Sequence, residues 1–561
     1  MRPLRAAPLL TLLVMLGPVA AGLLGTLAPA LGLFPALGGT GPSPAPFAAL
    51  AAWPGLPGAV GLSVTTGLAA TVLSLVLVTL TVAGWQGTRV MAALERALSP
   101  LLSVPHAAAA FGLAFLIAPS GWIARGLSPW ATGWERPPDL LIVQDPWGLA
   151  MVAGLVAKEV PFLLLMTLAA LPQAQPARRL TIARSLGYGR VTGWLKAVFP
   201  SVYAQVRLPV YAVLAYSMTV VDVAIILGPA TPPPLSVQVV RWMADPDLTL
   251  RLPAAAGAVL QLGLVLAALG LWRLGEIGAG RLGRAWAEGG ARRHGDGVAR
   301  ALGLGLAALS AGAVIAGLAG LGLWSVAGLW PFPDALPAGM SLTGWARHAP
   351  GLAAPALDTV WIAGAATALA LALALACLEA EHRFGLSPGA RSLWLLYLPL
   401  LVPQVAFLPG LQTFALVAGV DAGMGAVILG HLVFVLPYVF LSLAAPWRAW
   451  DARHATVAAA LGAGPGAVFW RVRLPMLLAP VLTAAAVGFA VSVGQYLPTL
   501  LIGGGRVQTL TTEAVALASG GDRRAIGVAA LMQTGVVVAG FALALTVPRL
   551  AWANRRGMRA A

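Results

Sequence analysis

The stretch TIARSLGYGRVTGWLKAVFP, residues 181–200, occurs a second time in altered form as TVAAALGAGPGAVFWRVRLP, residues 456–475. Both copies contain a Leu-Gly pair followed by a proline thirteen residues after the glycine, at Gly187 and Pro200 and at Gly462 and Pro475. Each copy is a basic loop between two apolar stretches. A loop that is made twice in this way indicates a docking surface for a partner with two-fold symmetry.

The chain is far more apolar than a soluble protein. Of its 561 residues, 59% are hydrophobic and 10% are charged, and the mean hydropathy is +0.86. Soluble domains have about 25% charged residues, and a membrane-spanning helix needs about 20 mostly apolar residues. The sequence therefore predicts an all-α integral membrane protein of about twelve transmembrane helices, with windows centred near residues 20, 72, 108, 160, 218, 264, 312, 367, 404, 435, 487 and 536.

The net charge of +16 could suggest a nucleic-acid partner, but the positions of the charges argue against one. If the N-terminus is cytoplasmic, 26 of the 35 Lys and Arg residues fall in cytoplasmic loops or tails. Cytoplasmic loops of membrane proteins carry an excess of Lys and Arg. The basic balance therefore predicts the topology, with both termini in the cytoplasm, and no nucleic acid is expected as a partner.

The repeat extends beyond the basic loops. Gly154 precedes Pro161 by seven residues, as Gly430 precedes Pro437, and the two pairs are 276 positions apart. We expect a first six-span half at 1–274 and a second at 300–561, inserted in the same orientation because each has an even number of spans. Residues 275–299, rich in Gly, Arg and small residues, are expected to be a flexible cytoplasmic linker.

Two further features bear on processing and on outer contacts. The apolar stretch at the N-terminus runs on to Phe34, which is longer than the apolar region of a signal peptide, so we expect an uncleaved first span. Segments 228–247 and 503–522 occupy matched external positions. They are either ordinary connecting loops or a surface that receives an external partner.

Signatures of an enzyme are absent from the sequence. A phosphate-binding loop needs Gly-Lys followed by Ser or Thr, and neither of the two lysines, Lys158 and Lys196, has that context. The six histidines show no metal-ligand spacing, and the single cysteine, Cys377, permits no disulfide within the chain. We expect no catalytic activity, no metal and no cofactor on this chain, so any ATP would be hydrolysed by another polypeptide.

The two basic loops resemble the "EAA" signature of permease subunits in binding-protein-dependent ABC importers. Leu474-Pro475 matches the end of that signature, whereas Phe199 replaces its leucine in the first copy, and Thr181 and Thr456 stand where the signature has Glu. The double-length form is similar to the fused permeases of ferric-iron and thiamine importers. The resemblance covers essentially the whole chain.

This resemblance implies a type I ABC importer permease fold, MetI-like, in a bacterial inner membrane. Two copies of an ATPase, which would bind ATP and Mg, are expected to dock on loops 178–200 and 453–475, and a periplasmic or extracellular solute-binding protein on the other side. Small residues in the loops would permit close helix approach, although a helix C-cap also explains the glycines. The expected coupling residues are Ala183, Leu186, Gly187, Pro200, Ala458, Leu461, Gly462 and Pro475.

A second class of protein, the twelve-span secondary transporter driven by an ion gradient, also has two halves and a long central linker. The repeated loops between spans four and five and between spans ten and eleven oppose it. The loop 85–98 also lacks the Gly- and Arg-rich signature of that class. A channel is a third, weaker alternative. The sequence leaves an oxyanion, a chelated metal and a small cationic vitamin open as substrates.

Three ionisable residues fall within predicted spans: Lys158 and Glu159 in span four and Asp222 in span five. Ionisable groups in a membrane usually face the bundle interior or a water-filled cavity. We expect Lys158 to pair with Asp222, because neighbours one residue apart on a helix do not face each other. Positions 158 and 159 correspond to Phe434 and Val435 in the second half. The cluster is therefore either one side of the path or gate, or a private structural pair of the first half.

Overall fold

The computed structural model describes residues 2–552 except 291, 293–295, 387–388 and 421. Within this part of the chain, nine helices are long and apolar enough to cross a membrane, and three bent helix pairs bring the number to twelve. The expected all-α membrane fold is thus confirmed, with nine to twelve candidate spans among the described residues. The span helices are α1 (Arg2–Ala30), α3 (Leu56–Trp85), α5 (His106–Ile117), α7 (Leu149–Ala174), α10 (Phe199–Thr219), α13 (Arg251–Glu288), α14 (Gly297–Val326), α15 (Thr343–Phe384), α17 (Gln404–Val417), α18 (Met424–Arg448), α22 (Leu478–Val493) and α25 (Arg523–Ala551).

Helix packing repeats between the two halves. Helix α7 packs against α3 and α10, and in the same way α18 packs against α15 and α22. The first helix of each half crosses to the other half: α1 packs against α15 and α17, and α14 packs against α3 and α5. The fold is therefore two homologous six-helix halves that exchange their first helices.

Glycines allow the exchanged helices to approach closely. Gly112 of α5 faces Gly317 of α14, and a Cβ added to Gly112 would lie 2.8 Å from the carbonyl carbon of Gly317. At the matching contact, a Cβ on Gly25 of α1 would overlap the carbonyl of Gly410 in α17. Small residues at such crossings are typical of membrane helices, which associate through close packing.

The fifth span of each half is interrupted near its end. Helix α10 stops at Thr219 and α11 (Asp222–Leu227) follows, just as α22 stops at Val493 and α23 (Leu497–Gly503) follows. Short helices α12 (Leu235–Ala244) and α24 (Leu510–Leu517) stabilise these breaks. The hydroxyl of Ser236 donates to the carbonyl of Val220 over 3.3 Å, and Thr511 donates to that of Val493. Segments 228–247 and 503–522 are therefore built into the fold rather than being plain connecting loops.

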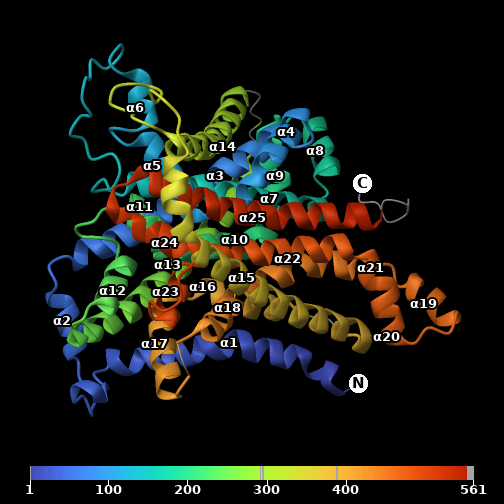
Figure 1. Cartoon of the computed structure of the whole chain (residues 1–561). Helices are drawn as coiled ribbons and strands as arrows, with labels where there is room; N and C mark the ends of the chain where they lie inside the picture. Colours follow the sequence, from blue (N-terminus) through green and yellow to red (C-terminus); the bar gives the residue numbers. More distant parts are fainter. Residues whose placement is uncertain (1, 291, 293–295, 387–388, 421, 553–561) are drawn as a thin grey trace.

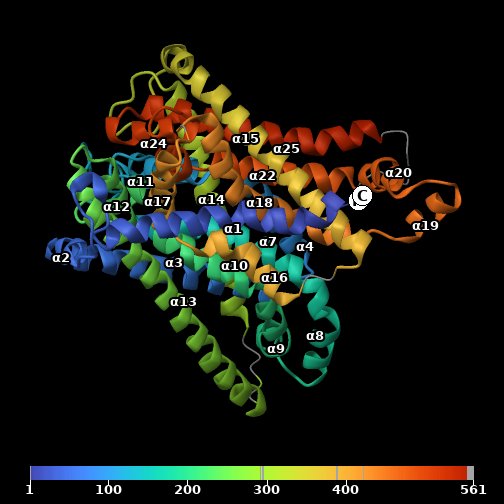
Figure 2. The same ribbon diagram turned by 90° about the horizontal axis from the view of Figure 1, so that it is seen from below.

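The start of α1 and the end of α25 lie at one end of the bundle, together with α8 (Pro176–Ser185) and α19 (Arg453–Ala460), as Figure 1 shows. Helices α12 and α24 and the short α2 (Ala45–Ala52) lie at the opposite end. Figure 2 shows that α8 and α19 are well separated at their common end. The arrangement gives two distinct surfaces at the end that carries the termini.

The segment expected to be a flexible linker is largely helical. Helix α13 continues without a break to Glu288, and α14 begins at Gly297. Good helix formers such as Leu, Arg, Ala and Glu occupy residues 279–288, and no proline interrupts them. The prediction of flexibility over the whole of 275–299 was therefore wrong, because glycine content alone does not stop a helix that is already nucleated.

Candidate functional site

The first repeated loop folds as a helical hairpin of α8 and α9 (Arg190–Ala197). Gly187 ends α8 with a left-handed backbone, φ +82°. The N–H of Tyr188 donates to the carbonyl of Ala183 over 3.1 Å, and that of Gly187 to Arg184 over 2.9 Å. This is the hydrogen-bond pattern of a Schellman cap, which favours glycine at the left-handed position.

The second loop ends α19 in the same way. Gly462 has φ +83°, the N–H of Ala463 donates to the carbonyl of Ala458 over 3.0 Å, and that of Gly462 to Ala459 over 2.9 Å. A Cβ added to Gly462 would meet nothing within 4 Å. The glycines are therefore present for their backbone conformation. The helix C-cap that the sequence left open for the two glycines is thus present at both positions, and the close approach of a partner helix stays a prediction.

Each loop presents exposed apolar side chains next to its cap. Leu186 is 51% exposed and Leu461 is 83% exposed, and Ile182 and Val457, one turn earlier, are also exposed. Such side chains at the end of a membrane protein are not part of its core. An exposed apolar patch of this kind marks a site of protein interaction.

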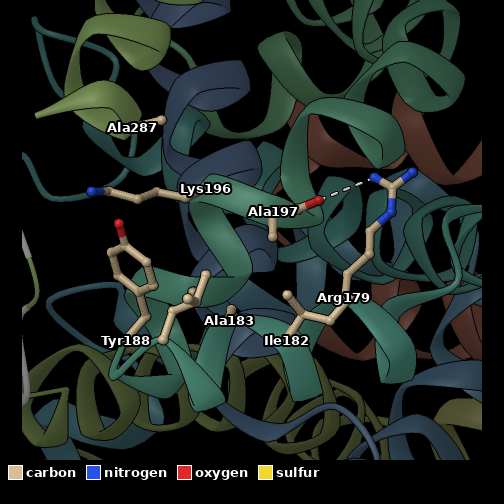
Figure 3. A pocket seen from close by; sticks show the side chains of 9 residues that line it. Arg179, Ile182, Ala183, Tyr188, Lys196, Ala197 and Ala287 are labelled. Atoms are coloured by element: carbon tan, nitrogen blue, oxygen red, sulfur yellow. Dashed lines mark hydrogen bonds between the residues drawn. The ribbon is translucent and has the colours of Figure 1, made fainter. Parts of the chain in front are cut away.

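A groove of about 280 Å³ lies between α8 and α9 (Figure 3). Ala183 is buried under α9, and Arg179 donates to the carbonyl of Ala197 over 3.0 Å, which ties the two helices together. Lys196 and Tyr188 border one side of the groove, with the ammonium 4.8 Å from the ring centre. The groove is lined by Arg179, Ile182, Ala183, Leu186, Tyr188, Gly193, Lys196, Ala197 and Ala287.

The two repeated prolines sit at different places relative to the bend into the membrane. Pro200 lies in the first turn of α10, and α9 meets α10 at 65° just before it. Pro475 lies in α21 (Leu474–Met476), and the 74° bend into α22 follows it. Proline is tolerated in a first helical turn, where its missing N–H costs nothing. The glycine-to-proline spacing is therefore the same in both loops, but the bend into the membrane-spanning helix lies before the proline in the first loop and after it in the second.

The first loop is anchored on the segment that joins the halves. The Lys196 ammonium donates to the carbonyl of Trp286 over 2.9 Å and lies 4.5 Å from the centre of that ring. The carboxylate of Asp296 accepts a hydrogen bond from the N–H of Val191 over 2.8 Å. The ends of α13 and α14 therefore hold α9 in place.

The second loop is anchored by a buried ion pair. Arg473, in the π-helical turn Phe469–Arg473, donates to Glu379 of α15 over 2.7 Å, and Arg383 donates to the same carboxylate over 2.6 Å. The guanidinium of Arg473 also lies over the ring of Trp450, 4.1 Å from its centre. Nothing in the repeated motif predicted this network, because position 473 corresponds to Val198 in the first loop.

The expected pair between Lys158 and Asp222 does not form: no ion pair joins them among the described residues. The Lys158 ammonium donates instead to the carbonyls of Leu101 and Val104, over 2.9 and 2.5 Å. Pro105 has no N–H to donate to the carbonyl of Leu101, which accepts a longer hydrogen bond from the N–H of Val104, over 3.3 Å, in addition to that from Lys158.

Glu159 and Asp222 lie in the interior of the bundle, 5% and 7% exposed. Glu159 lies on α7, which packs against α3 and α10. Asp222 is the first residue of α11, which packs against α5 and α7. The structure thus places the two carboxylates on helices that pack against each other.

Comparison with known proteins agrees with this geometry. The family model described as "Binding-protein-dependent transport system inner membrane component" matches residues 368–551. A relative is 33% identical over 518 residues, covering 91% of this chain and 92% of its own length. The chain therefore belongs to the family of permease subunits of binding-protein-dependent ABC transporters. That relative is the "Inner membrane ABC transporter permease protein YnjC" of Escherichia coli (strain K12).

Two shorter similarities lie in the same class. The "Molybdenum transport system permease protein ModB" of Mycobacterium tuberculosis is 37% identical over 124 residues, 20% of this chain and 47% of that protein. The "Spermidine/putrescine transport system permease protein PotC" of Haemophilus influenzae is 23% identical over 149 residues, 27% and 58% of the two chains. The importer permease function and the multi-pass inner-membrane location expected from the paired loops are confirmed, and an ATPase and a solute-binding protein are its partners.

Proposed function

We propose that two copies of the ATPase bind this chain, one on each coupling loop, at 178–200 and 453–475. The observation that supports this most is the doubled exposed leucine beside a left-handed glycine, at Leu186–Gly187 and Leu461–Gly462. The cap fixes the direction of each leucine relative to its helix. Ala183, Ala458, Pro200 and Pro475 shape the same two loops and complete the proposed coupling set.

In this proposal the coupling loops carry force between the ATPases and the membrane helices. Each loop is continuous with the fifth span of its half, through α10 or α22. ATP binding would draw the two loops together and open the path outward, and hydrolysis would reset it. The two sites are then linked by a conformational free energy.

We further propose that the end bearing the termini is cytoplasmic, that the halves are 1–274 and 300–561, and that the first span stays uncleaved. The excess of Lys and Arg on that side supports the orientation. The solute-binding protein would contact the opposite end, at segments 228–247 and 503–522. The chain itself would carry no catalytic activity and no cofactor, with ATP and Mg held by the ATPase.

Purification of the tagged full chain from its native membrane tests this proposal. We expect an ATPase to co-purify at about two copies per chain. Replacing Gly187 or Gly462 by Leu should leave insertion unchanged and lower the recovery of ATPase, because the Cβ atom of an L residue disfavours the left-handed backbone. A preparation that lacks an ATPase and transports in a protonophore-sensitive way would support the secondary transporter instead.

A further inference from the structure

The interruptions of the two fifth spans occupy equivalent positions of the repeat. We call residues 220–221, between α10 and α11, the first break, and residues 494–496, between α22 and α23, the second break. The two breaks align without a gap, because Gly228 and Gly503, which follow them, are 275 residues apart, as are the glycines of the coupling loops. A break removes hydrogen bonds from the helical ladder, so side chains of neighbouring helices must hold its two sides together.

The sixth span supports both breaks in the same way, through a buried glutamine. Gln261 of α13 donates to the carbonyl of Met218 over 3.0 Å. At the second break, Gln533 of α25 donates to Thr511, which donates to the carbonyl of Val493. Met218 and Val493 are equivalent positions of the repeat. Support from this side is therefore common to the two halves.

The second break has a further support, the imidazole of His431 on the fourth span, α18. Its Nδ1 lies 2.7 Å from the hydroxyl of Ser492, two residues before the break, and its Nε2 lies 2.9 Å from the hydroxyl of Thr499, three residues after it. His431 is 1% exposed, and a buried polar side chain is costly unless its hydrogen bonds are made. One side chain of the fourth span thus joins the two sides of the second break.

The hydroxyl of Thr499 determines which ring nitrogen of His431 carries the hydrogen. This hydroxyl donates to the carbonyl of Gln495, inside the break, over 2.9 Å. Because a hydroxyl has one hydrogen to donate, it accepts a hydrogen bond from Nε2–H of His431. In the neutral ring, Nδ1 then accepts from Ser492. A neutral imidazole therefore satisfies both hydroxyls without placing a charge in the membrane.

The first break lacks this support. Leu155 stands at the position of His431, and Ala224 stands at that of Thr499. Ser217, the counterpart of Ser492, is buried, and its hydroxyl has no hydrogen-bond partner among the described residues. The fourth and fifth spans nevertheless pack together in both halves. The histidine is therefore not needed to form the fold.

Each fifth span extends from its coupling loop to its break, so a force on the loop reaches the break along one helix. Resting on the coupling function proposed above, we propose that His431 is a positioning residue that keeps the second break rigid. The motion driven by ATP is then taken up mainly by bending at the first break. The path opens asymmetrically, although the two coupling loops present similar surfaces.

Hydrogen exchange of the full chain in lipid nanodiscs, followed by mass spectrometry, tests the difference in rigidity. After correction for intrinsic rates, we expect amides at 494–499 to exchange about tenfold more slowly than those at 219–224. His431→Leu, which copies the first half, should remove this difference. His431→Gln retains a donor and an acceptor and should restore part of it.

The reciprocal change adds the missing support to the first break. Leu155→His combined with Ala224→Thr should slow exchange there, because Ser217 already supplies the third group. Thr499→Val removes one bond to the imidazole at nearly constant shape and should speed exchange at the second break. Thr483→Val is the matched control, since this hydroxyl also donates to a backbone carbonyl four residues earlier, over 2.8 Å, but lies exposed on α22. It should leave both breaks unchanged.

The role in coupling is tested on the complex that co-purifies with its ATPase, with and without ATP and vanadate. We expect the nucleotide to raise exchange at the first break alone in the unaltered chain, and at both breaks in His431→Leu. The inference is overturned by equal protection of the two breaks, by an unchanged second break in His431→Leu, by a general loss of protection along α18, or by the same nucleotide response at both breaks. Absence of any co-purifying ATPase contradicts the proposed function, whereas an active ATPase with one of these four results contradicts the role of His431 alone.

Discussion

The two coupling loops present nearly the same surface outward and are held by different contacts inward. Both have a left-handed glycine after an exposed leucine. The first is held by the carbonyl of Trp286 and by Asp296, at the junction of the halves, whereas the second is held by the buried pair of Arg473 and Glu379. The two loops therefore share the exposed leucine–glycine surface that a symmetric partner would contact. The contacts that anchor each loop to the rest of the chain differ between the two halves.

The difference in anchoring extends to the way each loop enters the membrane. The bend follows α9 directly in the first half, but in the second half the chain passes through a π-helical turn and α21 before it bends. A π-turn inserts one extra residue into a helix and often marks a functional position. Arg473, the last residue of this turn, is buried.

The largest effect is expected from Glu379→Gln. The substitution would leave the 2% exposed Arg473 side chain without its carboxylate, and breaking a buried pair costs about 3–5 kcal/mol. We expect the second loop to become sensitive to protease while the first stays resistant. Limited proteolysis followed by mass spectrometry measures this.

Glu381→Gln is the matched control, because Glu381 pairs with Arg448, whose side chain is 42% exposed. An exposed pair is worth about 0–1 kcal/mol, so this variant should resemble the unaltered chain. Equal sensitivity of the two variants would contradict a special role for the buried pair.

An intermediate effect is expected from the glycine caps, and here the loops should behave alike. Replacing Gly187 or Gly462 by Ala forces a side chain into the left-handed region at a cost of about 1–2 kcal/mol, whereas Asn tolerates that region better. We expect each Ala variant to recover less ATPase than the Asn variant at the same position. Ala and Asn variants with the same recovery would show that backbone conformation is not what matters.

The smallest effect is expected from Lys196→Met, which removes the contact with Trp286 and costs about 0.5–1 kcal/mol. Arg471→Met is the equivalent change in the second loop, where the side chain is exposed. Hydrogen exchange of residues 190–197 should rise in the first variant, and the second loop should be unchanged in the other. An equal rise in both loops would mean that the anchors do not differ in the way described.

Much of the architecture follows from local properties of the sequence. Span positions depend on mean hydropathy over about 20 residues, and the glycine caps depend on a single backbone angle at Gly187 and Gly462, so both could be predicted. The partner of Lys158 could not, because it depends on where the break at Pro105 lies in three dimensions. Pro105 was nevertheless a usable signal, since a proline cannot donate a helical hydrogen bond to the carbonyl four residues before it.

The ionisable residues within the spans show the same limit more clearly. Glu159 and Asp222 could be singled out because charges within apolar spans are rare. Their surroundings could not be predicted, because these depend on which helices pack together in three dimensions. The exchange of first helices could not be predicted from the sequence either. Hydropathy shows which residues form a span, but it does not show which other spans pack against it.

The exchange of first helices sets an order for the synthesis of the protein. Helix α1 leaves the ribosome long before α17, against which it packs most extensively, because about 370 residues separate Ala30 from Gln404 at the start of α17. At 5–20 residues per second, α1 waits roughly 20 to 75 seconds in the lipid before its partner has been made. During that interval its glycine face, at Gly22 and Gly25, is turned to other molecules. The two halves therefore cannot mature one after the other, and the first is completed only when the second arrives.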